Sequence, residues 1–203
     1  MSPNVFAIAL NHQSQMDHWH DAFLEPPYKE LPKKAVWFIK PRNTHNVNNG
    51  EIVLDPAEQY YSGGTFAIVI GKKASRIKAE DACEYIEGFA LANEISLAEE
   101  SFYRPAIKAK CQDNSCPVGS VAKVCVASID IETWINGEKV DCYNTSGFIR
   151  NAGQILEALT DFATLEVGDM VLMGTPQKRV AIKSGDKVEI KAQGFETLVT
   201  FAK

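Results

Sequence analysis

Three basic side chains lie close together in an otherwise acidic chain: Arg104, Lys108 and Lys110. If residues 107–111 form an extended strand, Lys108 and Lys110 point to the same face. An arginine binds a carboxylate through two parallel hydrogen bonds, and a lysine contributes a point charge. The segment therefore predicts a site for a small dianion that all three side chains contact.

The same charges also have a simpler interpretation. Glu99, Glu100 and Asp113 lie nearby in the sequence and can pair with the basic residues on a solvated surface. Charge clusters are more often surface features than binding sites, so spacing alone favours this interpretation. Both interpretations stay open at the level of spacing.

Two polar turns are further candidates. Gly174-Thr175-Pro176 follows the apolar run at residues 170–173. A turn at the end of a strand can direct the Thr175 hydroxyl and backbone N–H groups at a ligand oxygen. Asn144-Thr145-Ser146 has the same potential. A plain turn is the commoner role of each triplet taken alone, so neither identifies a site by itself.

The four histidines show no pattern of metal ligation. His18 and His20 are two residues apart and would not share a helix face, and His12 and His45 have no partner at a ligand spacing. Each is interpreted as a surface or packing residue. The chain also lacks the nucleophile elbow, the zinc-protease motif, the phosphate-binding loop and the dinucleotide fingerprint.

Composition limits the class of protein. The 203 residues suit a single domain over 1–203, and 45% hydrophobic content is ordinary for a globular protein. A net charge of −5 argues against a nucleic-acid or anionic-membrane partner, because both need a basic surface. No apolar stretch approaches the roughly 18 residues of a membrane span, and the first residues do not resemble a signal peptide. Five cysteines without a CxxC spacing indicate reduced thiols in a cytoplasmic protein.

The elements that must position these residues are mostly strands. Amphipathic periodicity predicts helices at 13–23, 79–93 and 151–162, and residues 42–50 have the composition of a loop. Asn136-Gly137 is a strong hairpin signal. The predicted strands cover residues 6–10, 36–40, 66–70, 121–126, 133–135, 138–142, 170–173, 187–191 and 197–201. This pattern predicts a mixed α/β but β-rich fold, with a rolled sheet and a few outer helices.

The stretch SGGTFAIVIGKK, residues 62–73, has an unusual beginning. Its apolar run at 66–70 suits a strand buried on both faces. Gly63, Gly64 and Thr65 lead into that strand with almost no side chain. Such a beginning is either a plain turn or a functional position without its functional groups.

Several of these motifs together resemble the fumarylacetoacetate hydrolase family. They are TLEVGDMVLMGTP at 164–176, NTS at 144–146, the apolar run with GK at 66–72, and IKP at 39–41. Within the family, FYRPAIKAKC, VWFIKPRNT and ALNHQSQ resemble the first half of the tandem isomerase/decarboxylases of homoprotocatechuate (4-hydroxyphenylacetate) breakdown. This chain is similar to one half only, so the resemblance implies a stand-alone first subunit.

The resemblance implies both a fold and a chemistry. The fold is the family's rolled β-sheet, in a protein that forms homodimers or pairs with a second-half family chain. The substrates are oxo- or hydroxydienoate di- and tricarboxylates, which are isomerised (2-hydroxyhepta-2,4-diene-1,7-dioate) or decarboxylated (5-oxopent-3-ene-1,2,5-tricarboxylate). The family uses Mg²⁺ or Mn²⁺ as a Lewis acid on the developing enolate, with oxygen ligands.

Site residues follow from the resemblance position by position. The family's lysine corresponds to Lys110 and the threonine of its Gly-Thr-Pro turn to Thr175, which are expected to be catalytic. Gly174, Arg104 and Lys108 are expected to bind substrate. The third metal ligand corresponds to Glu94, but the first two correspond to Gly63 and Thr65, which carry no carboxylate.

The acid/base pair of the family is missing as well. Its histidine corresponds to Gln15 and its glutamate to His18. The sequence therefore predicts an isomerase/decarboxylase subunit whose own metal site is incomplete. Two alternatives remain open. One is a non-catalytic subunit that binds a dicarboxylate or acts as a scaffold, and the other is a metal-independent tautomerase that uses Lys110 as a base.

Overall fold

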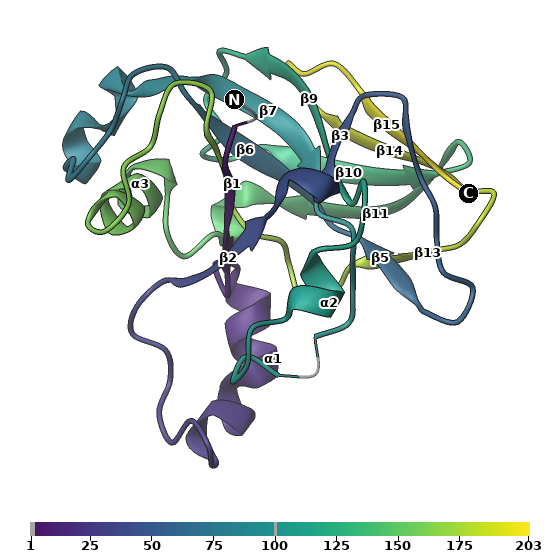
Figure 1. The fold of residues 1–203 in the computed structure, drawn as a ribbon, viewed down its shortest axis with the longest axis horizontal. Helices are drawn as coiled ribbons and strands as arrows, with labels where there is room; N and C mark the ends of the chain where they lie inside the picture. The colour runs from purple at the N-terminus through teal and green to yellow at the C-terminus, as the bar shows by residue number, and fades with distance from the viewer. Residues whose placement is uncertain (1–2, 100) are drawn as a thin grey trace.

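Seven strands form the main sheet of the computed structural model, which describes residues 3–99 and 101–203 (Figure 1). They are β1 (Val5–Ala9), β2 (Val36–Lys40), β3 (His45–Val47), β6 (Gly64–Ile70), β7 (Ile86–Asn93), β9 (Cys116–Ala122) and β12 (Met170–Leu172). Their order across the sheet is β2-β1-β12-β6-β7-β9-β3. Strands from both ends of the chain therefore meet in one sheet, since β1 pairs in parallel with β12.

The central strand β6 is buried along its whole length. It pairs antiparallel with β12 on one side and with β7 on the other. Neighbours on both edges and packing on both faces explain why its sequence, GTFAIVI, is apolar without alternation. The prediction of a strand buried on both faces is confirmed.

The helix predicted at 79–93 is wrong. Residues Ala79–Glu84 form a short 3-10 helix, η2, and Ile86–Asn93 form β7. The apolar residues at 82, 86, 89 and 90 fit a helix and a strand between two neighbours alike. Residues 86–93 form a strand because they pair with β6 and β9. Gly88 has a role there, because a Cβ atom at this position would lie 2.7 Å from the carbonyl oxygen of Ala122 in β9.

Two smaller sheets complete the fold. One has the order β11-β10-β14-β15-β4 and the other β13-β5-β8. The strands are β4 (Gly50–Ile52), β5 (Tyr60–Ser62), β8 (Ser96–Leu97), β10 (Asp130–Ile135), β11 (Glu138–Asn144), β13 (Val180–Ile182), β14 (Lys187–Ala192) and β15 (Leu198–Ala202). The predicted hairpin joins β10 and β11, and Asn136 and Gly137 have the positive φ values, 52° and 89°, of its two-residue turn.

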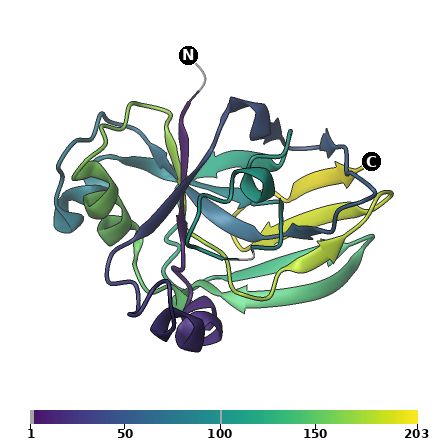
Figure 2. The same ribbon diagram turned by 60° about the horizontal axis from the view of Figure 1, so that its bottom comes forward.

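The longer helices lie outside the sheets, as expected (Figures 1 and 2). Helix α1 covers Gln13–Leu24, and α3 covers Ala152–Thr160 and packs against η2. Asn151 and Gln154 form a capping box at the start of α3, whose apolar face is buried. The remaining helical segments are α2 (Ile107–Lys110), η1 (Arg42–Thr44) and η3 (Thr145–Gly147).

Two predicted boundaries differ from the structure. The segment 42–50, expected to be a loop, contains η1, β3 and the first residue of β4. The strand expected at 121–126 begins earlier and ends at Ala122. The presence of β3 and the early start of β9 have one cause, because His45–Val47 pair in parallel with residues 116–118, a long-range contact that local composition does not encode.

The curled, β-rich mixed architecture agrees with the predicted fold class. All five cysteines fall in the described part of the chain, and there they are free thiols. Burial raises the pKa of the Cys116 thiol to about 12. Among the residues with described structure, no helix combines the length and hydropathy that crossing a membrane requires.

Candidate functional site: a buried ion cluster

The site is built where β7 ends beside the start of β6. Gly64 pairs with Asn93, and the backbone N–H of Glu94 donates to the carbonyl of Gly63 at 2.8 Å. Asn93 accepts hydrogen bonds from the Gly63 N–H and the Ser62 hydroxyl through its side-chain oxygen. These bonds fix the backbone and place the Glu94 side chain in the interior, where the residue is 2% exposed.

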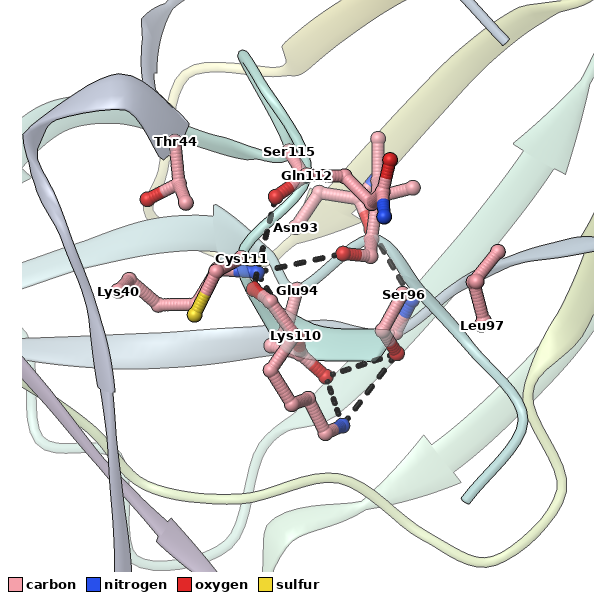
Figure 3. Close-up of polar contacts among 12 residues, drawn as sticks. Lys40, Thr44, Asn93, Glu94, Ser96, Leu97, Lys110, Cys111, Gln112 and Ser115 are labelled. Carbon is pink, nitrogen blue, oxygen red and sulfur yellow. Dashed lines mark hydrogen bonds and ion pairs between the residues drawn. The ribbon is translucent and has the colours of Figure 1, made fainter. Parts of the chain in front are cut away.

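Lys40 supplies the first cation next to Glu94. It is the last residue of β2, and its ammonium donates to Glu94 Oε1 at 3.1 Å and to Ser115 Oγ at 3.0 Å (Figure 3). Two backbone carbonyls, those of Ile95 and Lys110, complete its contacts at 3.3 and 2.5 Å. A buried ammonium with this many acceptors is fully compensated, so Lys40 is a fixed part of the interior.

Lys110 supplies the second cation, from the last position of the short helix α2. Its ammonium donates to Glu94 Oε2 at 2.8 Å and to Ser96 Oγ at 3.3 Å (Figure 3). It also forms an ion pair with Glu99 and lies 4.9 Å from the ring centre of Phe38. Lys110 therefore joins two carboxylates.

Arg179 supplies the third cation, three residues after the Gly-Thr-Pro turn. Its guanidinium donates to Glu99 Oε2 at 2.5 Å and to the Ser96 hydroxyl, and lies 3.9 Å from Glu94 Oε2. A Cβ atom at Gly63 would lie 3.4 Å from Arg179 Cδ and 2.9 Å from Thr175 Cγ2. The missing side chain at position 63 thus leaves room for Arg179.

These five side chains, Lys40, Glu94, Glu99, Lys110 and Arg179, are called the ion cluster below. Three are cations and two are carboxylates, so the cluster has one positive charge in excess. Burial acts to raise the pKa of Glu94, but Lys110, Lys40 and Arg179 together hold it well below its usual range. Glu94 is therefore ionised at neutral pH.

The turn at Gly174 lies beside the cluster. Gly174 has a φ of +97°, and its carbonyl accepts a hydrogen bond from the Thr65 hydroxyl at 2.5 Å. Gln15 uses its side-chain oxygen to accept from the N–H of Leu10 at 3.0 Å. Thr65 and Gln15 thus serve structural contacts here, as does Thr145, which binds the carbonyl of Val126.

Two adjoining cavities meet at this place. The inner cavity, about 10 Å³, is lined by Gln15, Thr65, Glu94, Glu99, Lys110 and Thr175, among others. The outer cavity, about 530 Å³, has mainly apolar walls, including Trp37, Phe38 and Phe102. Glu99, Lys110 and Phe38 line both cavities and so form the boundary between them. The inner space is only large enough for about one water molecule.

The structure brings together most of the predicted site residues. Glu94, Lys110, Gly174 and Thr175 line the inner cavity, and Arg104 lines the outer one. The condition for Lys108 and Lys110 to share a strand face is not met, because α2 covers Ile107–Lys110 and turns Lys108 away from Lys110. Lys108 is exposed, pairs with Glu58 and lines neither cavity. Its expected part in substrate binding has no support from this geometry.

Sequence reasoning missed Lys40 and Arg179 and treated Glu99 only as a surface partner of the basic residues. Glu99 does pair with Lys110, but in the interior. One local signal was present for Lys40, since a lysine directly after the apolar run VWFI ends a strand inside the protein. No local signal marks Arg179, whose partners lie some 80 residues away in the chain.

The ion cluster does not fit a divalent metal. Within the described ranges, no group of three or more histidine, cysteine, aspartate or glutamate side chains is placed to hold an ion. Of the three positions expected to hold a metal, only Glu94 carries a carboxylate, and cations already contact both its oxygens. A hard divalent ion needs several oxygen ligands and would be repelled by three neighbouring positive charges.

A larger cavity of about 700 Å³ lies elsewhere, between η2, α3 and the residues after β9. Its lining is mainly apolar and includes Ile86, Phe89, Val126 and Phe148. It contains no member of the ion cluster. Size alone does not make it the reactive site, and we assign the chemistry to the charged inner cavity.

Comparison with known proteins adds a family relationship. Residues 4–201 match the sequence model of the fumarylacetoacetate (FAA) hydrolase C-terminal family. The chain is 55% identical over 200 residues to the 4-hydroxyphenylacetate degradation bifunctional isomerase/decarboxylase of Salmonella dublin. That match covers 98% of this chain and 46% of the relative, so the chain spans about half the length of that protein.

Solved structures share the fold. The 2-hydroxyhepta-2,4-diene-1,7-dioate isomerase of Mycobacterium marinum has a TM-score of 0.81 and 28% identity, covering 99% of this chain and 74% of that one. The fumarylpyruvate hydrolase of Pseudomonas aeruginosa, solved in complex with Mn²⁺ and pyruvate, has a TM-score of 0.82 and 20% identity, covering 99% and 89%.

Proposed function

The chain belongs to the fumarylacetoacetate hydrolase family, and we propose that it is a subunit of an isomerase/decarboxylase that acts on oxo- and hydroxydienoate carboxylates in 4-hydroxyphenylacetate breakdown. In this proposal residues 1–203 form one domain. A second family chain supplies the part of the longer relative that this chain does not span. The observation that carries the proposal is the cation-rich ion cluster beside Thr175, in a chain so similar to that relative.

The chemistry suits the cluster. Isomerisation and decarboxylation of an oxo acid both pass through an enolate, and positive charge placed near the enolate oxygen stabilises it. Lys110 provides such a charge at the boundary of the two cavities, and Thr175 and Gly174 can orient the substrate by hydrogen bonds. In this proposal Lys110 and Thr175 are the catalytic residues of the chain.

The metal has a separate place in the proposal. A divalent ion, where a family member binds one, polarises the oxo acid as a Lewis acid. The ion cluster does not fit such an ion, so Mg²⁺ or Mn²⁺ belongs to the second chain. If the second chain binds the metal, Gly63 and Thr65 of this chain need no carboxylates for the complex to function.

A second candidate function is a subunit that binds a carboxylate without turning it over. The observation in its favour is Gln15, whose amide holds the N–H of Leu10 and supplies no acid or base beside the ion cluster. The tautomerase alternative has less support. Ion pairs with Glu94 and Glu99 hold Lys110, and Lys108, which was expected beside it, instead pairs with Glu58 on the surface.

The proposal is tested first by metal binding. Calorimetric titration of the isolated chain with MgCl₂ and MnCl₂ is expected to show no binding tighter than millimolar. Turnover of 2-hydroxyhepta-2,4-diene-1,7-dioate is then measured with and without a second-half family chain, and is expected only in the mixture. Tight metal binding by the isolated chain would contradict the incomplete site.

A matched pair of variants tests the site itself. Lys110→Met in the mixture is expected to lower turnover at least 100-fold, because the charge next to the reacting oxygen is lost. Lys73→Met removes a lysine whose partner, Glu166, is a surface residue, and is expected to leave turnover unchanged. Equal activity of the two variants would remove Lys110 from the mechanism, and turnover by the isolated chain in EDTA would support the tautomerase.

A further inference from the structure

The carboxylate of Glu99 is held between two cations. One oxygen pairs with the ammonium of Lys110, and the other accepts from the guanidinium of Arg179 at 2.5 Å. Both cations are nearly buried, with side chains 7% and 8% exposed. A buried ammonium and a guanidinium on opposite sides of one carboxylate are the usual means by which proteins bind a small carboxylate ligand.

Glu99 lies where such a ligand would have to pass. It lines both the inner and the outer cavity, together with Lys110. Arg179 lines neither cavity, and it donates to the Glu99 oxygen that Lys110 does not contact. Turning the Glu99 side chain outward would therefore free Lys110 and Arg179 for another carboxylate at the boundary of the two cavities.

The two carboxylates of the ion cluster are held differently. Glu94 directly follows β7, and its oxygens contact Lys40, Lys110 and the hydroxyl of Ser96. Glu99 lies two residues beyond β8 in a segment without regular structure. Its side chain is 11% exposed, against 3% for Glu94. Glu94 is thus a fixed counter-ion, while Glu99 can turn outward at lower cost.

Charge balance favours an incoming anion. The cluster already has one positive charge in excess, and removing Glu99 from it leaves two. A buried excess of this size is unfavourable unless another anion takes the vacated place. The cluster is therefore suited to exchange one carboxylate for another.

The outer cavity indicates what accompanies that carboxylate. Its walls include the rings of Trp37, Phe38, Phe102 and Tyr103, and Arg104 also lines it. Flat apolar walls suit an unsaturated carbon chain, and an exposed arginine suits a second carboxylate at the other end. Because Lys110 and Arg104 both line this mainly apolar space, a dicarboxylate has one more cationic partner there than a monocarboxylate.

We propose that Lys110 and Arg179 form a carboxylate-binding site, that Glu99 occupies it in the free protein, and that a small unsaturated dicarboxylate displaces Glu99. The second carboxylate of the ligand then binds Arg104 through the outer cavity. This inference deepens the proposed function and rests on it for the location of the site. Since Glu99 is tethered next to its partners, it competes at a high effective concentration and keeps the affinity for free carboxylates low.

Calorimetric titration with trans,trans-muconate tests the displacement. Glu99→Ala is expected to bind muconate at least tenfold more tightly than the original chain, because the internal competitor is gone. Glu99→Gln keeps the shape of the side chain and loses its charge, so its affinity for muconate is expected to lie between those of the original chain and Glu99→Ala. It replaces the alanine variant in the test if that variant does not fold. Unchanged or weaker binding by both variants would overturn the proposal, since Glu99 would then only neutralise its neighbours.

Three controls locate the binding. Glu166→Gln removes a carboxylate from a surface ion pair and is expected to leave muconate affinity unchanged. Arg179→Gln in the Glu99→Gln background is expected to remove the gain in affinity. Arg104→Ala is expected to weaken muconate but not sorbate, the matching monocarboxylate. Equal effects on both ligands would overturn the part assigned to Arg104.

The inference and the proposed function can fail separately. Muconate binding that tightens in Glu99→Ala, with no turnover in any mixture, supports the carboxylate site and contradicts the enzyme subunit. Turnover in the mixture with unchanged muconate affinity in both Glu99 variants supports the enzyme subunit and overturns the displacement.

Discussion

At the scale of single residues, Lys40 shows that the ion cluster is part of the core. The ammonium contacts Glu94, Ser115 and two backbone carbonyls, and its side chain is fully buried. Loss of one partner in a buried pair leaves the other charge without compensation, which costs more than the pair gains. The stability of the fold and the charge of the site therefore depend on the same atoms.

Lys40→Met is expected to lower the free energy of unfolding by roughly 3 kcal/mol, because Glu94 loses a partner in the interior. Urea denaturation followed by circular dichroism measures the change. Lys73→Met, at a pair whose side chains are 64% and 59% exposed, is expected to cost less than about 1 kcal/mol. Similar losses of unfolding free energy in the two variants would show that Lys40 does not form the buried contacts with Glu94 and Ser115.

Glu94 also predicts a dependence of stability on pH. Its pKa in the folded chain lies well below the ordinary value of 4.5, so the unfolded chain takes up the proton first as the pH falls. The stabilisation is complete above that ordinary value and is lost as the pH falls further toward the folded pKa. The free energy of unfolding is therefore expected to decrease below about pH 5.

The contribution of Glu94 is separated by Glu94→Gln, which cannot titrate at this position. Its free energy of unfolding is expected to fall less steeply between about pH 5 and pH 3 than that of the original chain. Urea denaturation at each pH provides both curves. Parallel curves would mean that Glu94 does not contribute to the dependence of stability on pH.

At the scale of elements, close pairing of β7 and β9 depends on Gly88. A Cβ atom there would lie 2.7 Å from Ala122 O and 2.7 Å from Val121 Cγ1, so one of the strands must move. Gly88→Ala is expected to destabilise the fold by about 1–3 kcal/mol through overpacking.

Gly119, in β9, offers a matched control for this substitution. The nearest atom to a Cβ atom at Gly119 is 3.6 Å away, which is an ordinary contact. Gly119→Ala is therefore expected to change stability by less than about 1 kcal/mol. If Gly119→Ala lowers the free energy of unfolding as much as Gly88→Ala does, the effect comes from strand propensity and not from the close approach of β9 to Gly88.

The elements that sequence predicted well are those whose signal is local. The Asn136-Gly137 turn, the capped helix α3 and the apolar strand β6 each encode their structure within a few residues. Residues 79–93 failed because their periodicity fits a helix and a paired strand alike, and only the neighbours β6 and β9 decide.

The site follows the same rule. Lys110, Thr175 and Glu94 were predicted from family motifs and do meet at one cavity. Lys40 and Arg179 contact the carboxylates of the ion cluster from other parts of the chain, and no spacing within the segment of Arg179 shows its partners. Local patterns can thus name candidate charges, but the partner of a buried charge is set by tertiary pairing.

At the scale of the whole molecule, the two ends of the chain hold the sheets together. Near the N-terminus β1 pairs with β12, and at the C-terminus β15 lies between β14 and β4. Most residues of β15 are buried. The chain is therefore expected to fold as one cooperative unit dominated by contacts between distant residues.

Deletion of residues 198–203 tests this cooperativity. Removing β15 exposes the edges of β14 and β4 and the apolar core beneath them, so the truncated chain is expected to lose tertiary structure throughout. Near-ultraviolet circular dichroism and amide hydrogen exchange compare it with the full chain. Retained protection in β6 and β7 would instead indicate that the main sheet folds independently.

The burial of Lys40 beside Glu94 has a consequence for how this sequence tolerates change. A library of single substitutions, scored separately for protein abundance and for turnover, should divide the ion cluster in two. Positions 40 and 94, whose side chains are 0% and 3% exposed, should lose the most abundance, whereas positions 99, 110 and 179, at 11%, 7% and 8%, should lose less abundance for the same loss of turnover. Among natural relatives, the residues at 40 and 94 should accordingly be exchanged together or not at all.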